Sequence, residues 1–341
     1  MAKETRNFAY NKILLDNKET FNKKYNIKPK ESESFFTGIL KFLGFYQPQN
    51  KKIIFSPPNK NKYKNVDKYG QEYYCDFNFE KCDTLILSGG ALKCIYFLGA
   101  LSGLKSERIK QFKNYGGTSC GAIVSSLMAV GYTPFEIFKV LLIETVSLTE
   151  ITQMLEKTIN ICSKMFLNKG FRPDITFSQL YMETGNKVSF IAFNVTKLKE
   201  EILCIENYPN LPVLFAAKLS CSLPMIFPVS RFEDNIFIDG IFYDNFPIKL
   251  SKLFLDRNHT MCISTLSSHY DKSISEYYDN PNYKIILIPD VVNKYFLLTK
   301  KDKFYMFVTG YNYTEENQQL RKKAIIKTLS LDNLSSGKHF R

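Results

Sequence analysis

The chain has 341 residues, of which 45% are hydrophobic and 15% aromatic, so it can bury a large core. We expect one α/β domain with appendages. No apolar stretch is long enough to span a bilayer, and the polar N-terminus lacks the apolar run of a secretory signal. The eight cysteines form no Cys-x-x-Cys pair or Cys/His cluster, which argues against a zinc site and favours reduced thiols inside a cell.

The net charge of +13 is concentrated at the two ends of the chain. Residues 1–80 carry 15 Lys and Arg against 9 Asp and Glu, and residues 281–341 carry 11 against 5. Basic ends around a near-neutral middle favour an anionic membrane surface, because each lysine or arginine near one contributes ~1 kcal/mol of attraction. Solvated lysines without a partner are the alternative. Nucleic acid is not expected, because no zinc-finger, homeodomain or RNP signature accompanies the charge.

Residues 1–80 are interpreted as a basic accessory segment. Within it, residues 51–68 are rich in Lys, Asn and Pro and predict a loop or linker. Residues 35–46 are short and dense in apolar side chains. They predict either a helix packed on the core, which we prefer, or an interfacial membrane segment.

The first buried strand is predicted at residues 84–87, followed by the turn Ser88-Gly89-Gly90-Ala91 and a helix over 92–104. A turn of small residues before a helix leaves backbone N–H groups unpaired and directed at one point, which suits a developing oxyanion. Gly89, Gly90 and Ala91 are therefore candidates for an oxyanion hole. A nucleotide phosphate loop is the competing interpretation, although the spacing of the known glycine fingerprints is absent.

The segment Gly117-Thr118-Ser119-Cys120-Gly121 has the layout of a nucleophile elbow. Such a turn holds the central side chain in disfavoured backbone geometry at the top of a sheet, and small flanking residues avoid collisions. Ser119 is the candidate nucleophile, with Gly117 and Gly121 forming the elbow. An ordinary structural turn explains the pentapeptide alone equally well.

The rest of the chain alternates predicted strands and helices. Residues 134–180 are mostly helical and lie where a lid or cap could sit. Residues 299–331 predict one or two basic helices that close the domain. Further strands are predicted at residues 187–194, 202–205, 236–238, 261–265 and 284–288. The pattern predicts a mostly parallel central sheet with helices on both faces.

A base for Ser119 is predicted at Asp239, which ends a short apolar strand and precedes Gly240, where close backbone approach is possible. A turn-forming aspartate is the alternative for this segment taken alone. The three histidines are alternatives. His259 precedes a strand and would lie at the wrong end of the sheet, whereas His269 follows it and is better placed. His339 lies near the C-terminus.

The motifs around Ser88, Ser119 and Asp239 occur together and in an order that resembles the patatin-like phospholipases. The similarity extends over residues 84–288, including the segment 216–224 and the sequence that follows Asp239. Four residues depart from the family pattern: Ala91 and Cys94 replace glycines, Lys93 replaces arginine, and Ile241 replaces glycine or alanine. Ala91 requires either a negative φ or backbone strain. Lys93 keeps a positive charge but loses the planar fork of arginine.

This resemblance implies a patatin-like α/β fold and a Ser119–Asp239 dyad that works without histidine. It implies a phospholipase A-type lipid acyl hydrolase that forms an acyl-enzyme and needs no metal or cofactor, with Lys93 and Gly240 in supporting positions. A soluble thioesterase or carboxylesterase on the same dyad and a lipid-binding pseudoenzyme are the alternatives.

The expected parts are the accessory segment 1–80, a catalytic core at 81–290 and a basic closing segment at 291–341. The expected substrate is a phospholipid or another acyl-ester lipid. The expected location is the cytoplasm, with peripheral attachment to a membrane.

Overall fold

The structure is a computed structural model that describes residues 79–144, 147–254, 259–265, 282–292 and 294–314, together with residues 65–66, 72–73, 277 and 280. The predictions for residues 35–46, His269, His339 and the end of the C-terminal segment lie outside these residues. β1 (Asn65–Val66), which lies within the segment 51–68 predicted as a loop, pairs with β2 (Glu72–Tyr73) as an antiparallel ladder.

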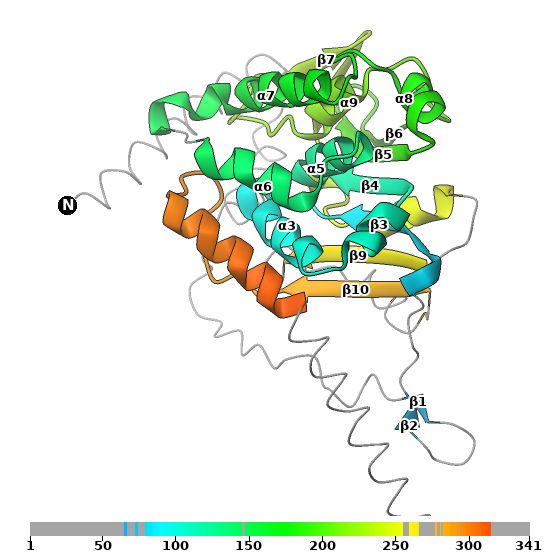
Figure 1. The fold of residues 1–341 in the computed structure, drawn as a ribbon. Helices are drawn as coiled ribbons and strands as arrows, with labels where there is room; N and C mark the ends of the chain where they lie inside the picture. The colour runs from blue at the N-terminus through cyan, green and yellow to red at the C-terminus, as the bar shows by residue number, and fades with distance from the viewer. Residues whose placement is uncertain are drawn as a thin grey trace, which may run out of the picture.

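The central element is an eight-stranded sheet with the order β10-β9-β3-β4-β5-β8-β7, in which β6 also pairs with β5 (Figure 1). The strands are β3 (Cys82–Leu87), β4 (Asn114–Thr118), β5 (Lys187–Asn194), β6 (Lys199–Cys204), β7 (Ser230–Phe232), β8 (Asn235–Asp239), β9 (His259–Thr265) and β10 (Tyr283–Ile288). From β10 to β5 the ladders are parallel, whereas β6, β8 and β7 are joined by antiparallel ladders. The predicted α/β fold with a mostly parallel sheet is confirmed.

Among the described residues, seven α-helices that precede β9 lie on one face of the sheet (Figure 1). They are α3 (Cys94–Ser102), α4 (Ser106–Gln111), α5 (Cys120–Ala129), α6 (Pro134–Ile143), α7 (Met154–Asn168), α8 (Phe177–Thr184) and α9 (Val213–Ser220), with the short 3-10 helices η2 (Phe79–Lys81), η3 (Ala91–Lys93) and η4 (Leu148–Gln153). Leu85 and Leu87 of β3 point into this core, while Ile86 joins the cluster on the other face. This alternation is expected of a strand that is buried on both sides.

The second face is covered, in the described part of the chain, by less regular structure. The 3-10 helices η5 (Gly240–Phe242) and η6 (Ile248–Leu253) follow β8, and Ile248 and Leu250 of η6 pack with Ile86 and Cys262.

Residues 300–314 form a helix, shown in orange in Figure 1, that crosses α3 at very close range. A Cβ at Gly99 of α3 would lie 2.0 Å from the carbonyl oxygen of Phe307, and one at Gly310 would lie 2.1 Å from that of Tyr96. Two glycines therefore allow the backbones to touch, and this contact fixes the helix at residues 300–314 on the core. None of the described helices has the length and hydropathy needed to cross a bilayer.

Candidate active site

Ser119 lies in the sharp turn between β4 and α5. Its backbone has φ 54° and ψ −123°, a conformation that is strained for a residue with a side chain. A Cβ at Gly117 would lie 2.5 Å from the backbone of Gly121, and one at Gly121 would lie 2.5 Å from the carbonyl oxygen of Leu87. Both flanking positions therefore need glycine, which is the geometry of a nucleophile elbow.

The hydroxyl of Ser119 donates a hydrogen bond of 2.6 Å to Oδ2 of Asp239. Asp239 is only 2% exposed, and its other oxygen accepts from the backbone N–H of Ile241 at 3.0 Å. Both carboxylate oxygens are therefore held, one by the candidate nucleophile and one by the backbone.

Ser119 and Asp239 meet because two strands end against each other on one edge of β5. Strand β4 runs parallel to β5 and places Thr118 opposite Ile191, whereas β8 runs antiparallel and places Asp239 opposite Ala192. Because β6 occupies the other edge of β5 along this stretch, β4 and β8 share the same edge. The carboxyl ends of β4 and β8 therefore face each other along β5. This brings Ser119, the residue after β4, next to Asp239 at the end of β8.

Gly240 allows the chain to turn away at this junction. A Cβ at this position would lie 2.3 Å from the carbonyl oxygen of Ile191, so any other residue would push β8 away from β5.

Burial raises the pKa of Asp239 to about 7, although the hydrogen bonds from Ser119 and Ile241 act in the opposite direction. A carboxyl group with this pKa exchanges its proton near neutral pH, as a general base requires.

Ser220 at the end of α9 supports the backbone of the elbow, a role that no sequence motif indicates. Its Oγ accepts a 2.9 Å hydrogen bond from the backbone N–H of Ser119 and donates one of 2.6 Å to the carbonyl of Ile191. This fully buried hydroxyl ties the turn to β5. It lies in the segment 216–224 that resembles the family, but nothing in the sequence indicates these two contacts.

The backbone N–H groups of the three candidate oxyanion residues differ in whether they already donate a hydrogen bond. The N–H of Gly89 donates to the carbonyl of Asn245 at 2.9 Å, so it is not available for a substrate. The N–H groups of Gly90 and Ala91 have no acceptor among the described residues. Gly90 has φ 153°, and Ala91 adopts φ 52°, so the substitution of glycine by alanine is accommodated by strain rather than by a negative φ.

Lys93 is fully buried beneath this turn. Its amine lies 2.5 Å from Oδ2 of Asp290 and 4.0 Å from the centre of the Tyr295 ring. The lysine thereby ties η3 to the segment that follows β10, and its charge is neutralised by Asp290. The expected positive charge near the oxyanion turn is present, but as half of a buried ion pair.

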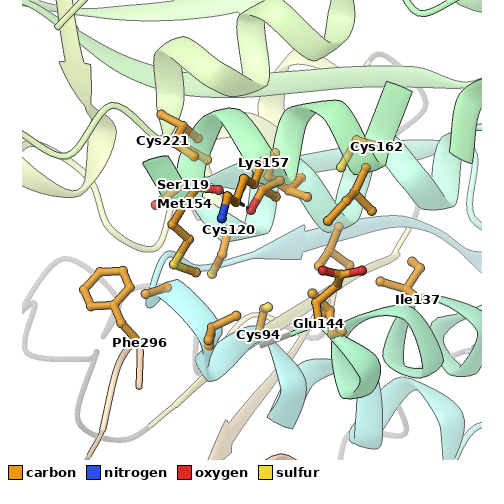
Figure 2. A pocket seen from close by; sticks show the side chains of 18 of the residues that line it. Cys94, Ser119, Cys120, Ile137, Glu144, Met154, Lys157, Cys162, Cys221 and Phe296 are labelled. Atoms are coloured by element: carbon orange, nitrogen blue, oxygen red, sulfur yellow. Dashed lines mark hydrogen bonds between the residues drawn. The ribbon is translucent and has the colours of Figure 1, made fainter. Parts of the chain in front are cut away.

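A mostly apolar pocket begins at Ser119 and Asp239 and follows α5 past Ile123 and Leu127. In Figure 2, Met154 and Phe296 lie at the end near Ser119, and Ile137 and Cys162 lie toward the other end. The walls come mainly from α3, α5, α6, α7 and the segment 291–341, with further residues from the loop after α9 and from η5. They include Val140, Leu141, Glu144, Leu155, Lys157, Thr158, Ile161, Met165, Cys221, Leu223, Phe227, Ile241 and Lys303. Such a slot suits a hydrocarbon chain whose polar end is at the serine.

The described cysteines are unpaired, and four of them, Cys94, Cys120, Cys162 and Cys221, line this pocket (Figure 2). Burial raises the pKa of the Cys162 thiol to about 12 and that of Cys221 well above its usual value. These thiols therefore act as small apolar side chains at neutral pH.

The described part of the chain brings no histidine to the pair formed by Ser119 and Asp239. His259 begins β9 opposite Cys82, at the amino ends of the parallel strands, while Ser119 follows the carboxyl end of β4. The residues that the structure describes also contain no cluster of His, Cys, Asp and Glu side chains that could hold a metal ion.

The family model of patatin-like phospholipase matches residues 85–251. Probable lipid hydrolase 463L of Invertebrate iridescent virus 6 is 31% identical over 288 residues, which cover 78% of this chain and 98% of that protein. Triacylglycerol lipase 4 of Saccharomyces cerevisiae is 28% identical over 207 residues, covering 50% of this chain and 22% of the lipase. The fold is similar to the crystal structure of VipD from Legionella pneumophila, with a TM-score of 0.47 and 16% identity. The matched region covers 81% of this chain and 72% of the VipD chain.

Proposed function

Because this chain belongs to the patatin-like phospholipase family, we propose that it is a phospholipase A-type hydrolase that cleaves carboxylic esters of membrane phospholipids. The observation that carries the proposal is the 2.6 Å hydrogen bond between Ser119 and a buried Asp239 at the head of an apolar pocket. A lipid hydrolase in general follows from the family, and the phospholipid substrate is the proposed part.

In the proposed mechanism, the carboxylate of Asp239 accepts the hydroxyl proton while Ser119 Oγ attacks the ester carbonyl carbon. The carbonyl oxygen becomes negatively charged, and the free N–H groups of Gly90 and Ala91 stabilise it. The ester C–O bond then breaks, the leaving alcohol takes the proton from Asp239, and the acyl group stays on Ser119. Water, deprotonated by Asp239, attacks the acyl-enzyme, releases the fatty acid and returns the proton to Ser119.

The apolar pocket supports an acyl chain as the bound part of the substrate. Its walls offer few polar atoms, and the polar side chains of Glu144 and Lys157 lie at positions exposed to solvent. A chain held along α5 places its ester carbon at Ser119 and leaves the rest of the lipid outside.

The proposed division into three parts needs one change. Phe296 and Lys303 line the pocket, so the segment 291–341 contributes to the site in addition to closing the fold. We further propose that the enzyme is cytoplasmic and attaches peripherally to anionic membranes, supported by the +6 charge excess at each end of the chain.

The test is to incubate the full chain with vesicles of mixed phospholipids and to identify the products by mass spectrometry, with Ser119→Ala as the control. We expect free fatty acid and lysophospholipid from the wild type and neither from the variant. Hydrolysis of a monomeric ester or thioester without hydrolysis of vesicles would favour a soluble esterase. Lipid binding without any hydrolysis would identify a pseudoenzyme, and either result would overturn the phospholipase proposal.

A further inference from the structure

We propose that the outward faces of α6 and of the helix at residues 300–314 together form the surface that docks on an anionic phospholipid bilayer. This inference rests on the proposed function, because it assigns a face of the enzyme to the surface on which its substrate lies.

The two helices are joined firmly enough to act as one surface. The rings of Phe138 and Phe307 stack with their centres 4.0 Å apart. The buried amine of Lys303 donates to the carbonyl of Leu141 at 2.7 Å and also to that of Glu144. These carbonyls end α6, where the helix dipole favours a positive charge. The helices lie side by side in Figure 1.

The outward face of this pair is apolar although it meets solvent. On α6, Phe135 is 50% exposed and Ile143 is 68% exposed, and their spacing puts them on one side of the helix. On the neighbouring helix, Phe304 is 57% exposed and Tyr311 follows two turns later on the same side. Exposed aromatic and branched side chains gathered on one face indicate an interaction site.

The lysines on this face indicate which partner it fits. Lys139 lies between Phe135 and Ile143 on α6, and Lys300 and Lys301 begin the second helix. None of these three amines forms an ion pair with a residue that the structure describes. Unpaired lysines beside aromatic rings are typical of proteins that lie on anionic lipid, where the rings enter the interface and the amines meet the headgroups.

Two nearby acidic side chains already have hydrogen-bond and amine partners. Glu136 caps α6 by accepting from Thr133 and lies 3.7 Å from the amine of Lys169. Asp302 accepts from Thr299 and from Lys294. Glu144 is exposed at the end of α6, and its backbone carbonyl accepts from the buried amine of Lys303. With Lys139, Lys300 and Lys301 against this one further carboxylate, the local charge stays positive, which complements a negative bilayer.

The face is also continuous with the pocket. Ile137, Val140 and Leu141 on the other side of α6 line the pocket, and so does Glu144 at its end. A bilayer on the outer face of α6 would lie one helix away from the bound acyl chain. A lipid could then pass around the end of α6 without crossing bulk water.

The test measures binding of the full chain to phosphatidylcholine vesicles with and without phosphatidylserine. Phe304→Gln combined with Ile143→Gln should weaken binding to both kinds of vesicle by about tenfold or more, because each apolar side chain loses burial in the interface. Replacing Lys139, Lys300 and Lys301 by Gln should remove about tenfold or more of the preference for phosphatidylserine. Both variants should hydrolyse a small soluble ester at the wild-type rate.

The matched control is Met182→Gln on α8, which removes a side chain that is 74% exposed away from this face (Figure 1). It should bind vesicles as the wild type does. Unchanged vesicle binding by the apolar double variant and the lysine variant would overturn the proposal. A change in the sedimentation of these variants would also overturn it, because it would assign the face to a second copy of the chain. Failure of the proposed function would be seen separately, as a wild type that binds vesicles but hydrolyses no lipid.

Discussion

Asp239 accepts a 2.6 Å hydrogen bond from Ser119, although 120 residues separate the two in the chain. The contact depends on backbone structure rather than on a flexible side chain, because each residue directly ends or follows a strand that pairs with β5. The proposed dyad is thus held in place before substrate arrives, which lowers the cost of reaching the reactive geometry.

The first prediction concerns pH. Because the pKa of Asp239 is raised to about 7, its carboxyl group is increasingly protonated below that pH and can no longer accept the proton of Ser119. We expect kcat/KM for a soluble ester to fall roughly tenfold per pH unit below pH 7 and to level off above it. A flat profile down to about pH 5 would show that Asp239 is not the base.

The second prediction concerns Asp239→Asn, which should lower kcat by about 10³-fold or more because the base is lost. The same change should stabilise the fold at high pH. Since the pKa of Asp239 in the folded state lies above the ordinary aspartate value of 3.8, wild-type stability is greatest below pH 3.8 and falls as the pH rises to about 7.

The check is thermal unfolding of both proteins at two pH values. The melting temperature of Asp239→Asn should exceed that of the wild type at about pH 8, and the difference should shrink at about pH 5. Equal melting temperatures at both pH values would show that burial of the ionised Asp239 carboxylate does not destabilise the fold.

Part of this site could be predicted from the sequence, and part could not. Glycines in Gly117-Thr118-Ser119-Cys120-Gly121 indicate the elbow because local sterics require them, and Asp239 is marked by its place at the end of an apolar strand. The strand β4 is indicated only by the elbow that follows it, because its residues Asn114–Thr118 include two glycines and do not form an apolar run. A Cβ at Gly116 would lie 2.5 Å from Ile86, so tight packing replaces hydrophobicity there.

The missed features all depend on contacts between distant segments. The bond from the N–H of Gly89 to Asn245, the ion pair of Lys93 with Asp290 and the two bonds of Ser220 join residues that no local pattern connects. The antiparallel course of β8 is a further example, because the direction of a strand is set by the connections around it.

The third prediction tests Ser220 as a positioning residue. Ser220→Ala removes the acceptor for the N–H of Ser119 and the donor to Ile191, so the strained elbow should lose its geometry. We expect kcat to fall about tenfold or more with KM little changed, because the nucleophile and not the acyl pocket is affected.

The matched control is Ser126→Ala on α5, another fully buried serine whose hydroxyl donates to a helix carbonyl at 2.8 Å. It should lose a similar amount of stability and keep its kcat. If the two variants lose activity in parallel with stability, Ser220 contributes only to folding.

The fourth prediction concerns the length of the acyl chain. Leu127 lies eight residues beyond Ser119 on the pocket side of α5, about 12 Å along the helix. Leu127→Phe should therefore slow hydrolysis of long-chain esters by about tenfold or more, since the larger ring occupies the far end of the slot.

Butyrate esters should react with Leu127→Phe as with the wild type, because a short chain does not reach that position. Cys162→Ala, which shortens a side chain of α7 in the same pocket, should keep long-chain hydrolysis. An equal loss for short and long esters would contradict the assignment of this pocket to the acyl chain.

The proposed mechanism requires that Ser119, activated by Asp239, forms the acyl-enzyme. It is tested most directly by labelling the full chain with a fluorophosphonate probe and locating the adduct by peptide mass spectrometry. We expect one labelled residue, Ser119, with label lost in Ser119→Ala and formed much more slowly in Asp239→Asn. Label at another serine in the wild type, or undiminished label in Ser119→Ala, would contradict it.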